Sequence, residues 1–184
     1  MIIGVLGRKG SGKDTISDYI IQKFNFEKMI IAEPLKNACK ELFNFSDEQL
    51  YGDLKETVDP QWEVSPRKVL QWLGTDVFRN RIGELNPEIG NNFWVNLLKV
   101  RYLQKLSKNK NIKIVVSDVR FQNEIDIIHK LGGKVIKLTR PSINNADAHE
   151  SEKNIDTLKG DYDILNDSSL EELYKKVEEI FCKN

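Results

Sequence analysis

The sequence predicts an α/β fold in three layers, with a central parallel sheet of five strands and helices on both faces. Three observations predict it. The 184-residue chain alternates short apolar runs with stretches of helical periodicity. Its apolar N-terminal run leads directly into a glycine-rich loop and then into a helical pattern. Its most continuous β-branched run, residues 112–117, lies in mid-chain, as expected of a central parallel strand.

Short apolar runs mark the five expected strands, which span residues 2–6, 26–32, 112–117, 134–138 and 162–165. Apolar residues three and four apart mark the expected helices, which span about 13–24, 34–43, 66–79, 92–106, 121–130 and 170–181. Pro34 can open the second helix, and Gly132 with Gly133 ends the fifth. Right-handed crossovers then place all strands parallel, with the ligand site beyond their carboxyl ends.

Length and composition narrow the function classes. The chain is expected to form one domain, residues 1–184. Its 28 basic and 28 acidic residues balance, so we expect neither a nucleic-acid polymer nor a membrane as partner. Cys39 and Cys182 form no C-x-x-C pair, so we expect neither a structural zinc site nor a disulfide framework. Two cysteines without such a role fit a reducing compartment, and we expect a cytoplasmic protein. The oligomeric state stays open, and a homodimer is a possible one.

Residues 7–15 form the pattern G-x-x-x-x-G-K, which indicates a phosphate-binding loop. Its glycines let successive N–H groups point at one anion, and the next helix adds its positive N-terminus. Lys13, expected to be a surface side chain without core packing, would reach the outer phosphates. The following residue is Asp14 where a magnesium-binding hydroxyl is usual, so its carboxylate is the expected metal ligand, directly or through water. The expected phosphate-loop residues are Gly10, Ser11, Gly12, Lys13, Asp14 and Thr15.

The carboxyl ends of other strands supply further candidates. Asp118 directly follows the central strand and could hold a magnesium-bound water or accept from a substrate hydroxyl. Arg120 could grip a phosphate with its planar guanidinium. Glu124 follows the same central strand, and Lys36 and Asn37 are candidates from the end of the second strand.

Two other segments combine charge with aromatic or titratable groups. The segment 67–79 places arginines beside aromatics, which suits a base and its phosphate, with Arg67, Gln71 and Asp76 as candidates. Trp94 is a further candidate for substrate binding, although tryptophans such as Trp72 and Trp94 are more often core residues than platforms for a base. The segment 140–157 is polar and irregular and is expected to be a lid. It opens with Arg140 and contains His149 and Glu150.

Among the proteins that carry such a phosphate-binding loop, a small phosphotransferase fits this sequence best. The base-reading N-K-x-D of GTPases is missing, and a motor ATPase would need a longer chain. We therefore expect a donor nucleotide on the loop, and an acceptor bound by an insertion at about residues 44–110.

Seven short motifs, in order along nearly the whole chain, resemble the deoxynucleoside monophosphate kinases of bacteriophage type within the P-loop nucleoside monophosphate kinase superfamily. They are S-G-K-D-T (11–15), A-E-P-L-K (32–36), L-Q-W-L-G-T-D (70–76), D-V-R (118–120), T-R-P (139–141), H-E-S-E (149–152) and N-D-S-S-L-E-E-L (166–173). The resemblance accounts for Asp14, because G-K-D-T is that family's form of the loop. It implies a P-loop kinase fold, ATP and Mg²⁺ as donor system, and a deoxynucleoside monophosphate as acceptor.

The resemblance also implies roles for single residues. It puts Lys13 and Arg140 at the transferring phosphate and Asn166 near the donor base. The acceptor contacts that it implies are Lys9, Lys36, Arg67, Asp118 and Arg120, and Lys55 is a further basic candidate.

Two alternative functions share these features. Animal phosphomevalonate kinases have the same G-K-D and E-S-E stretches but a different phosphorylated acceptor, and the two loop cations Arg8 and Lys9 would serve either one. A nucleotide-sensing module would bind without transfer, although it would need fewer cations than this chain carries.

Overall fold

The structure, a computed structural model, describes residues 1–141 and 154–182. The chain forms two compact units. The first consists of Met1–Ile30 and Leu98–Asn184, and the second of Ile31–Leu97. Each unit has its own secondary structure and its own buried side chains, so each is described separately.

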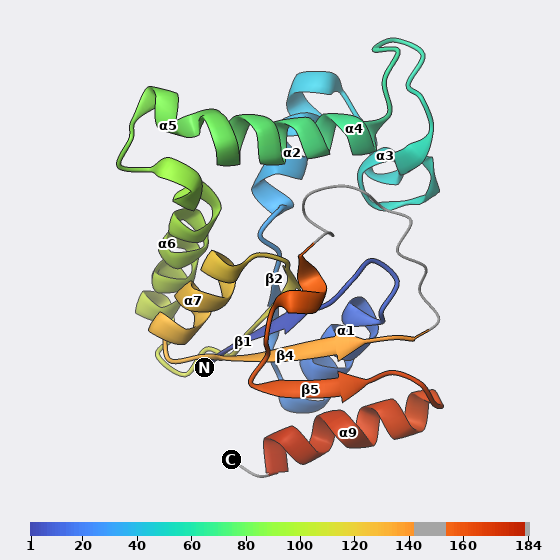
Figure 1. Cartoon of the computed structure of the whole chain (residues 1–184), viewed down its shortest axis with the longest axis vertical. Coiled ribbons are helices and arrows are strands. Elements are labelled where there is room, and N and C mark those ends of the chain that lie inside the picture. The colour runs from blue at the N-terminus through green and yellow to red at the C-terminus, as the bar shows by residue number, and fades with distance from the viewer. Residues whose placement is uncertain (142–153, 183–184) are drawn as a thin grey trace. The chain divides into compact units, whose positions relative to one another are not determined.

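The first unit is built on a sheet of five parallel strands in the order β2-β3-β1-β4-β5 (Figure 1). This confirms the predicted α/β class and places β1, which leads into the glycine-rich loop, at the centre. The strands are β1 (Ile2–Leu6), β2 (Glu27–Met29), β3 (Ile114–Val119), β4 (Lys134–Thr139) and β5 (Tyr162–Leu165). β2 is shorter than predicted because the chain leaves the sheet there for the second unit.

Helices cover both faces of this sheet (Figure 1). Helices α1 (Lys13–Phe24) and α9 (Leu170–Cys182) pack on one face, where Ile3 and Val5 of β1 join their buried side chains. Helix α7 (Gln122–Lys130) packs on the other face. A Cβ added at Gly4 would lie 2.6 Å from Ile128 Cδ1, so this close approach of helix and strand requires glycine.

The second unit is largely helical. The predicted acceptor-binding insertion, at about residues 44–110, contains a short helix near its beginning, and the sequence pattern S-x-x-Q encodes the start of this helix. Ser46 Oγ accepts from the Gln49 N–H at 3.2 Å, and Gln49 Oε1 accepts from the Ser46 N–H at 2.9 Å. The elements of the second unit are α2 (Glu33–Phe43), α3 (Asp47–Tyr51), η1 (Asp53–Glu56), α4 (Pro66–Gln71), η2 (Trp72–Arg81), α5 (Ile82–Leu85) and η3 (Gly90–Asn92). Helix α6 (Phe93–Lys108) begins in this unit and continues in the first.

The predicted helix over residues 66–79 changes its winding after Gln71, where π-type hydrogen bonding replaces the α-helical pattern in η2. Inside this unit Trp94 is buried, stacks edge-on against Phe78 and Phe93, and donates its Nε1–H to Gly74 O at 2.8 Å. Trp94 is therefore a core residue of the second unit, the role that its sequence context favours. Its contact with a substrate stays a prediction. None of the helices in the described part of the chain is long and apolar enough to cross a membrane.

Candidate functional site

The loop between β1 and α1 has a backbone that only glycine adopts easily. Gly10 and Gly12 have φ values of 80° and 99°. Gly7 is constrained by space, because a Cβ there would lie 2.5 Å from Leu138 O and 2.7 Å from Ser11 Oγ. The three glycines therefore curl the loop tightly at the carboxyl end of the central strand, as the sequence pattern predicts.

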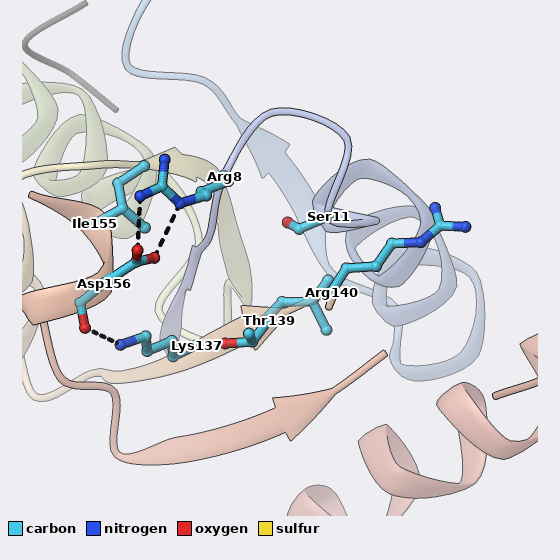
Figure 2. Close-up of a pocket in the computed structure, with 8 residues that line it drawn as sticks. Arg8, Ser11, Lys137, Thr139, Arg140, Ile155 and Asp156 are labelled. Atoms are coloured by element: carbon cyan, nitrogen blue, oxygen red, sulfur yellow. Dashed lines mark hydrogen bonds and ion pairs between the residues drawn. The ribbon is translucent and has the colours of Figure 1, made fainter. Parts of the chain in front are cut away.

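A cavity of about 200 Å³ lies beside this loop (Figure 2). Its walls are Arg8 and Ser11 of the loop, residues 137–140 at the end of β4, and Ile155 with Asp156. Ser11 Oγ is buried and has no hydrogen-bond partner among residues 1–141 and 154–182, so its hydroxyl can donate to a bound anion. Asn166, expected near a donor base, donates its side-chain Nδ2–H to Ser11 O at 2.9 Å and so helps to fix the loop.

Lys13 is not the surface side chain that we expected from the sequence. It is only 7% exposed, and its Nζ donates to Arg8 O within the loop at 2.5 Å. Burial, followed by the positive charge of Arg120, lowers the pKa of Lys13 to about 7, against the opposing effects of Asp14 and Asp118. The expectation was wrong because the loop wraps over the first turn of α1 and removes the ammonium from water.

The turn after β3 is held by a buried carboxylate. Glu124, in the first turn of α7, is 2% exposed, and its Oε2 accepts from the backbone N–H of Arg120 at 2.8 Å and of Phe121 at 3.3 Å. These bonds fix the turn that carries Asp118 and Arg120, the two residues expected at this strand end. The sequence-based role of Glu124 in direct substrate contact stays a prediction.

Asp14 lies in the first turn of α1 with its side chain 82% exposed. Its Oδ1 accepts from Lys28 Nζ at 3.2 Å, and Lys28 also donates to Asp18 Oδ1 at 3.0 Å. Lys28 was missed from the sequence, because only the packing of β2 beside α1 brings it to these carboxylates. Among the described residues no cluster of three or more histidine, cysteine or acidic side chains could hold a metal by itself.

Arg140 follows β4 directly, and its Nη1 donates to Gly10 O at a long 3.5 Å. Its expected role at the transferring phosphate stays a prediction. Lys9 and Thr15 belong to the loop and to the start of α1. His149 and Glu150 lie outside the described residues.

The second unit contains the other expected acceptor residues. Lys36 Nζ lies 3.9 Å from the ring centroid of Tyr51, and Arg67 Nε lies 3.9 Å from Glu56 Oε1 with its side chain 17% exposed. Each is therefore already ordered by a partner from the same unit. Asn37 lies in α2, Lys55 in η1, Gln71 at the end of α4 and Asp76 in η2.

Comparison with known proteins gives a family match over most of the chain. The family model described as deoxynucleotide monophosphate kinase matches residues 1–59 and 49–177. A protein of Acanthamoeba polyphaga mimivirus, provisionally named a deoxynucleotide monophosphate kinase, is 43% identical over 182 residues, covering 96% of this chain and 94% of its own. The deoxynucleotide monophosphate kinase of Enterobacteria phage T4 is 33% identical over 138 residues, or 75% of this chain. The chain spans 53% of that phage protein.

Solved structures share the fold at low sequence identity. Shikimate kinase from Aquifex aeolicus superposes with a TM-score of 0.54 at 14% identity, covering 98% of this chain and 96% of its own. Dephospho-CoA kinase from Campylobacter jejuni gives a TM-score of 0.52 at 18% identity, covering 99% and 96%. These similarities concern the fold alone, and they confirm the predicted P-loop kinase architecture.

Proposed function

The chain belongs to the deoxynucleotide monophosphate kinase family, and on this premise we propose that it transfers the γ-phosphoryl group of ATP to the phosphate of a deoxynucleoside monophosphate. The products are ADP and a deoxynucleoside diphosphate. Membership of this family shows that the chain is a nucleotide kinase. We propose ATP as the phosphoryl donor and a deoxynucleoside monophosphate as the acceptor.

The observation that carries the proposal is the loop itself. The left-handed backbone at Gly10 and Gly12 suits a loop whose successive N–H groups converge on one anion. The buried Ser11 hydroxyl adds a donor that has no partner in the part of the chain that the structure describes. Lys13 and Arg140 bring positive charge to the same loop. Together these groups suit the outer phosphates of a nucleoside triphosphate, where charge develops during transfer.

A magnesium ion fits the donor set of this site. Asp14 and Asp118 are hard oxygen ligands, and the negative charge of each raises the pKa of Lys13, which supports a role for both near the phosphate loop. Mg²⁺ commonly takes only one or two carboxylates and completes its shell with waters and substrate phosphates. We assign Asp14 and Asp118 to it. The ion, when bound, would neutralise charge on the donor phosphates.

The acceptor needs no general base, because a phosphate oxygen of a monophosphate is already anionic. The proposed acceptor cations are Arg120, Lys36 and Arg67, each suited to phosphate by charge. We keep residues at about 44–110 as the proposed acceptor-binding segment and about 140–157 as the proposed lid. We place the reaction in the cytoplasm of the producing or infected cell, consistent with the free thiols of Cys39 and Cys182.

An acceptor panel tests this function. The protein is incubated with ATP and Mg²⁺ together with each common deoxynucleoside monophosphate, each ribonucleotide and phosphomevalonate, and ADP and the phosphorylated product are measured. We expect transfer to one or more deoxynucleotides and weak transfer to the matching ribonucleotides. Transfer to phosphomevalonate alone, or ATP binding without transfer to any acceptor, would refute the proposal.

Lys13→Met shows whether the phosphate loop is responsible. Removing one donor from such a site typically costs about 10²- to 10³-fold in kcat. Lys113→Met is the matched control, because Lys113 Nζ also donates to a backbone carbonyl, Phe24 O at 3.2 Å. Lys113 precedes β3 and so lies at the amino end of this strand, whereas Asp118 and Arg120 lie at its carboxyl end. Lys113→Met should retain full activity.

A further inference from the structure

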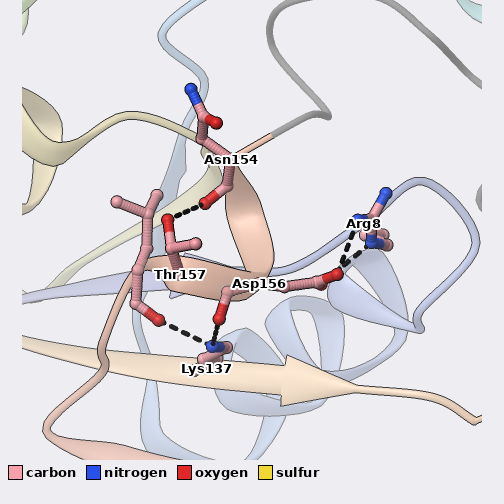
Figure 3. A network of polar contacts seen from close by, with 6 residues as sticks. Arg8, Lys137, Asn154, Asp156 and Thr157 are labelled. Atoms are coloured by element: carbon pink, nitrogen blue, oxygen red, sulfur yellow. Dashed lines mark hydrogen bonds and ion pairs between the residues drawn. The ribbon is translucent and has the colours of Figure 1, made fainter.

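A short 3₁₀-helix, η4 (Ile155–Thr157), is fixed against the end of β4 (Figure 3). Lys137 Nζ donates to the backbone oxygens of Asp156 at 2.8 Å and of Leu158 at 2.6 Å. Ile155 is 2% exposed and anchors the same turn in the core. The backbone of Asp156 therefore has a defined place beside the phosphate loop.

The Asp156 side chain points from η4 to the second residue of that loop (Figures 2 and 3). Its Oδ1 accepts from Arg8 Nε at 2.9 Å and its Oδ2 from Arg8 Nη2 at 2.7 Å, a bidentate pair. The hydrogen bonds from Arg8 hold the pKa of the Asp156 carboxyl below its ordinary value. Two of the five guanidinium N–H donors are used in this way, while the group still lines the cavity with Ser11.

The backbone of Arg8 connects this pair to the phosphate-binding groups. Its carbonyl oxygen accepts from Lys13 Nζ at 2.5 Å and from the Ser11 N–H at 3.2 Å. Arg8 is thus held through its side chain by Asp156 and in turn holds the lysine ammonium and the loop amide. A continuous series of contacts runs from Lys137 through Asp156 and Arg8 to Lys13.

We propose that Asp156 is a positioning residue for phosphoryl transfer. It acts through Arg8, keeping the start of the loop, the Lys13 ammonium and the inward edge of the Arg8 guanidinium in place for the donor phosphates. The inference rests on the proposed function, because that function supplies ATP as the phosphoryl donor. Asp156 is 61% exposed, and an ion pair this accessible contributes little to the free energy of unfolding. The Arg8–Asp156 pair therefore serves to position the loop and not to stabilise the fold.

The test compares Asp156→Asn with wild type in the full chain. We expect kcat/KM for ATP to fall about tenfold, the size expected for loss of one charge-assisted interaction, while KM for the deoxynucleotide changes less than about twofold. The melting temperature should change little. Asp156→Glu, which restores the charge, should recover part of the loss. Tighter ATP binding in Asp156→Asn would overturn the proposal, because it would show that the carboxylate competes with phosphate for Arg8.

Two further variants separate positioning from general stability. In an Arg8→Met background, Asp156→Asn should add no further loss, since the carboxylate acts only through Arg8. Additive losses would overturn the proposal. Asp161→Asn is the matched control, because Asp161 also forms ion pairs, with His129 and Lys134, but precedes β5 and lies away from the loop. It should lower the melting temperature and leave kcat/KM for ATP unchanged.

Calorimetric titration of ATP without acceptor keeps this test independent of the proposed function. If wild type binds ATP but phosphorylates no deoxynucleotide, the acceptor assignment fails, and weaker ATP binding by Asp156→Asn still supports the positioning role. If Asp156→Asn binds and transfers as wild type does, the positioning role fails and the proposed function stands.

Discussion

Lys28 in β2 donates a hydrogen bond to Asp14 in the first turn of α1, with Nζ 3.2 Å from Oδ1. The same ammonium lies 3.0 Å from Asp18 Oδ1, one helical turn further along. Burial lowers the pKa of Lys28, but the hydrogen bonds and negative charges of these two aspartates together outweigh burial, and the net shift of the pKa is upward. The proposed magnesium ligand is therefore already paired with a cation in the protein without ligands.

This pairing predicts a measurable competition. Lys28→Met should lower the Mg²⁺ concentration needed for half-maximal rate, because it removes a positive charge from the carboxylate that the ion would use. Asp14→Ala should raise that concentration, and Asp14→Ser should partly restore it. Asp18→Asn is the control, since it touches the same lysine and should have a much smaller effect. An unchanged magnesium titration in Asp14→Ala would show that ATP and waters hold the ion alone.

The pKa of Lys13, lowered to about 7 by burial and Arg120, predicts a pH dependence. The free protein loses the Lys13 proton as the pH rises through neutrality, and only the ammonium binds phosphate strongly. We therefore expect kcat/KM for ATP to fall above about pH 7, approaching tenfold per pH unit. Lys13→Arg should lack this decline, because guanidinium stays protonated. The same decline in Lys13→Arg would assign it to ATP or to another group.

Arg67 predicts a loss directed at the acceptor. Removing one partly buried, charge-assisted phosphate contact costs about 2–4 kcal/mol, so Arg67→Ala should lower kcat/KM for the deoxynucleotide roughly 30- to 1000-fold. KM for ATP should move little. Arg81→Ala is the matched control in the same unit, because Arg81 is 63% exposed and pairs with Glu84 three residues on. Equal losses in the two variants would mean that Arg67 acts only through the unit's stability.

Asp161 predicts an acid-sensitive part of the stability. Burial alone would raise its pKa, but hydrogen bonds from His129, the Val135 N–H and Lys134 outweigh burial and lower it. A carboxyl with a lowered folded-state pKa stabilises the protein at pH values above its unfolded pKa. That contribution is lost as the pH falls through the folded value. Asp161→Asn should therefore cost about 1–2 kcal/mol in urea unfolding at neutral pH. The difference from wild type should shrink below about pH 4; a constant difference would rule out this ionisation as its cause.

Local patterns in the sequence were sufficient for the architecture and for the phosphate loop. The loop could be predicted because glycine at positions 7, 10 and 12 and lysine at 13 specify backbone conformation and charge within a few residues. The parallel sheet followed from apolar runs alternating with helical periodicity, and helical periodicity placed most helices correctly. The Ser46 capping box is also a local pattern, although the helices expected from the sequence do not include the short helix α3 that it begins.

Contacts between residues far apart in sequence depended on the packed structure. Arg8 and Asp156 are 148 positions apart, and no sequence pattern near either one indicates the other. Lys28 meets Asp14 only because β2 packs beside α1. Lys13 is buried, and its pKa lowered, only because the folded loop excludes water from a side chain that composition alone assigns to the surface. Sequence periodicity was therefore sufficient to predict the helices and strands and their order. The protonation and the partners of the site residues depend on burial from water and on distances between side chains, which only the packed structure sets.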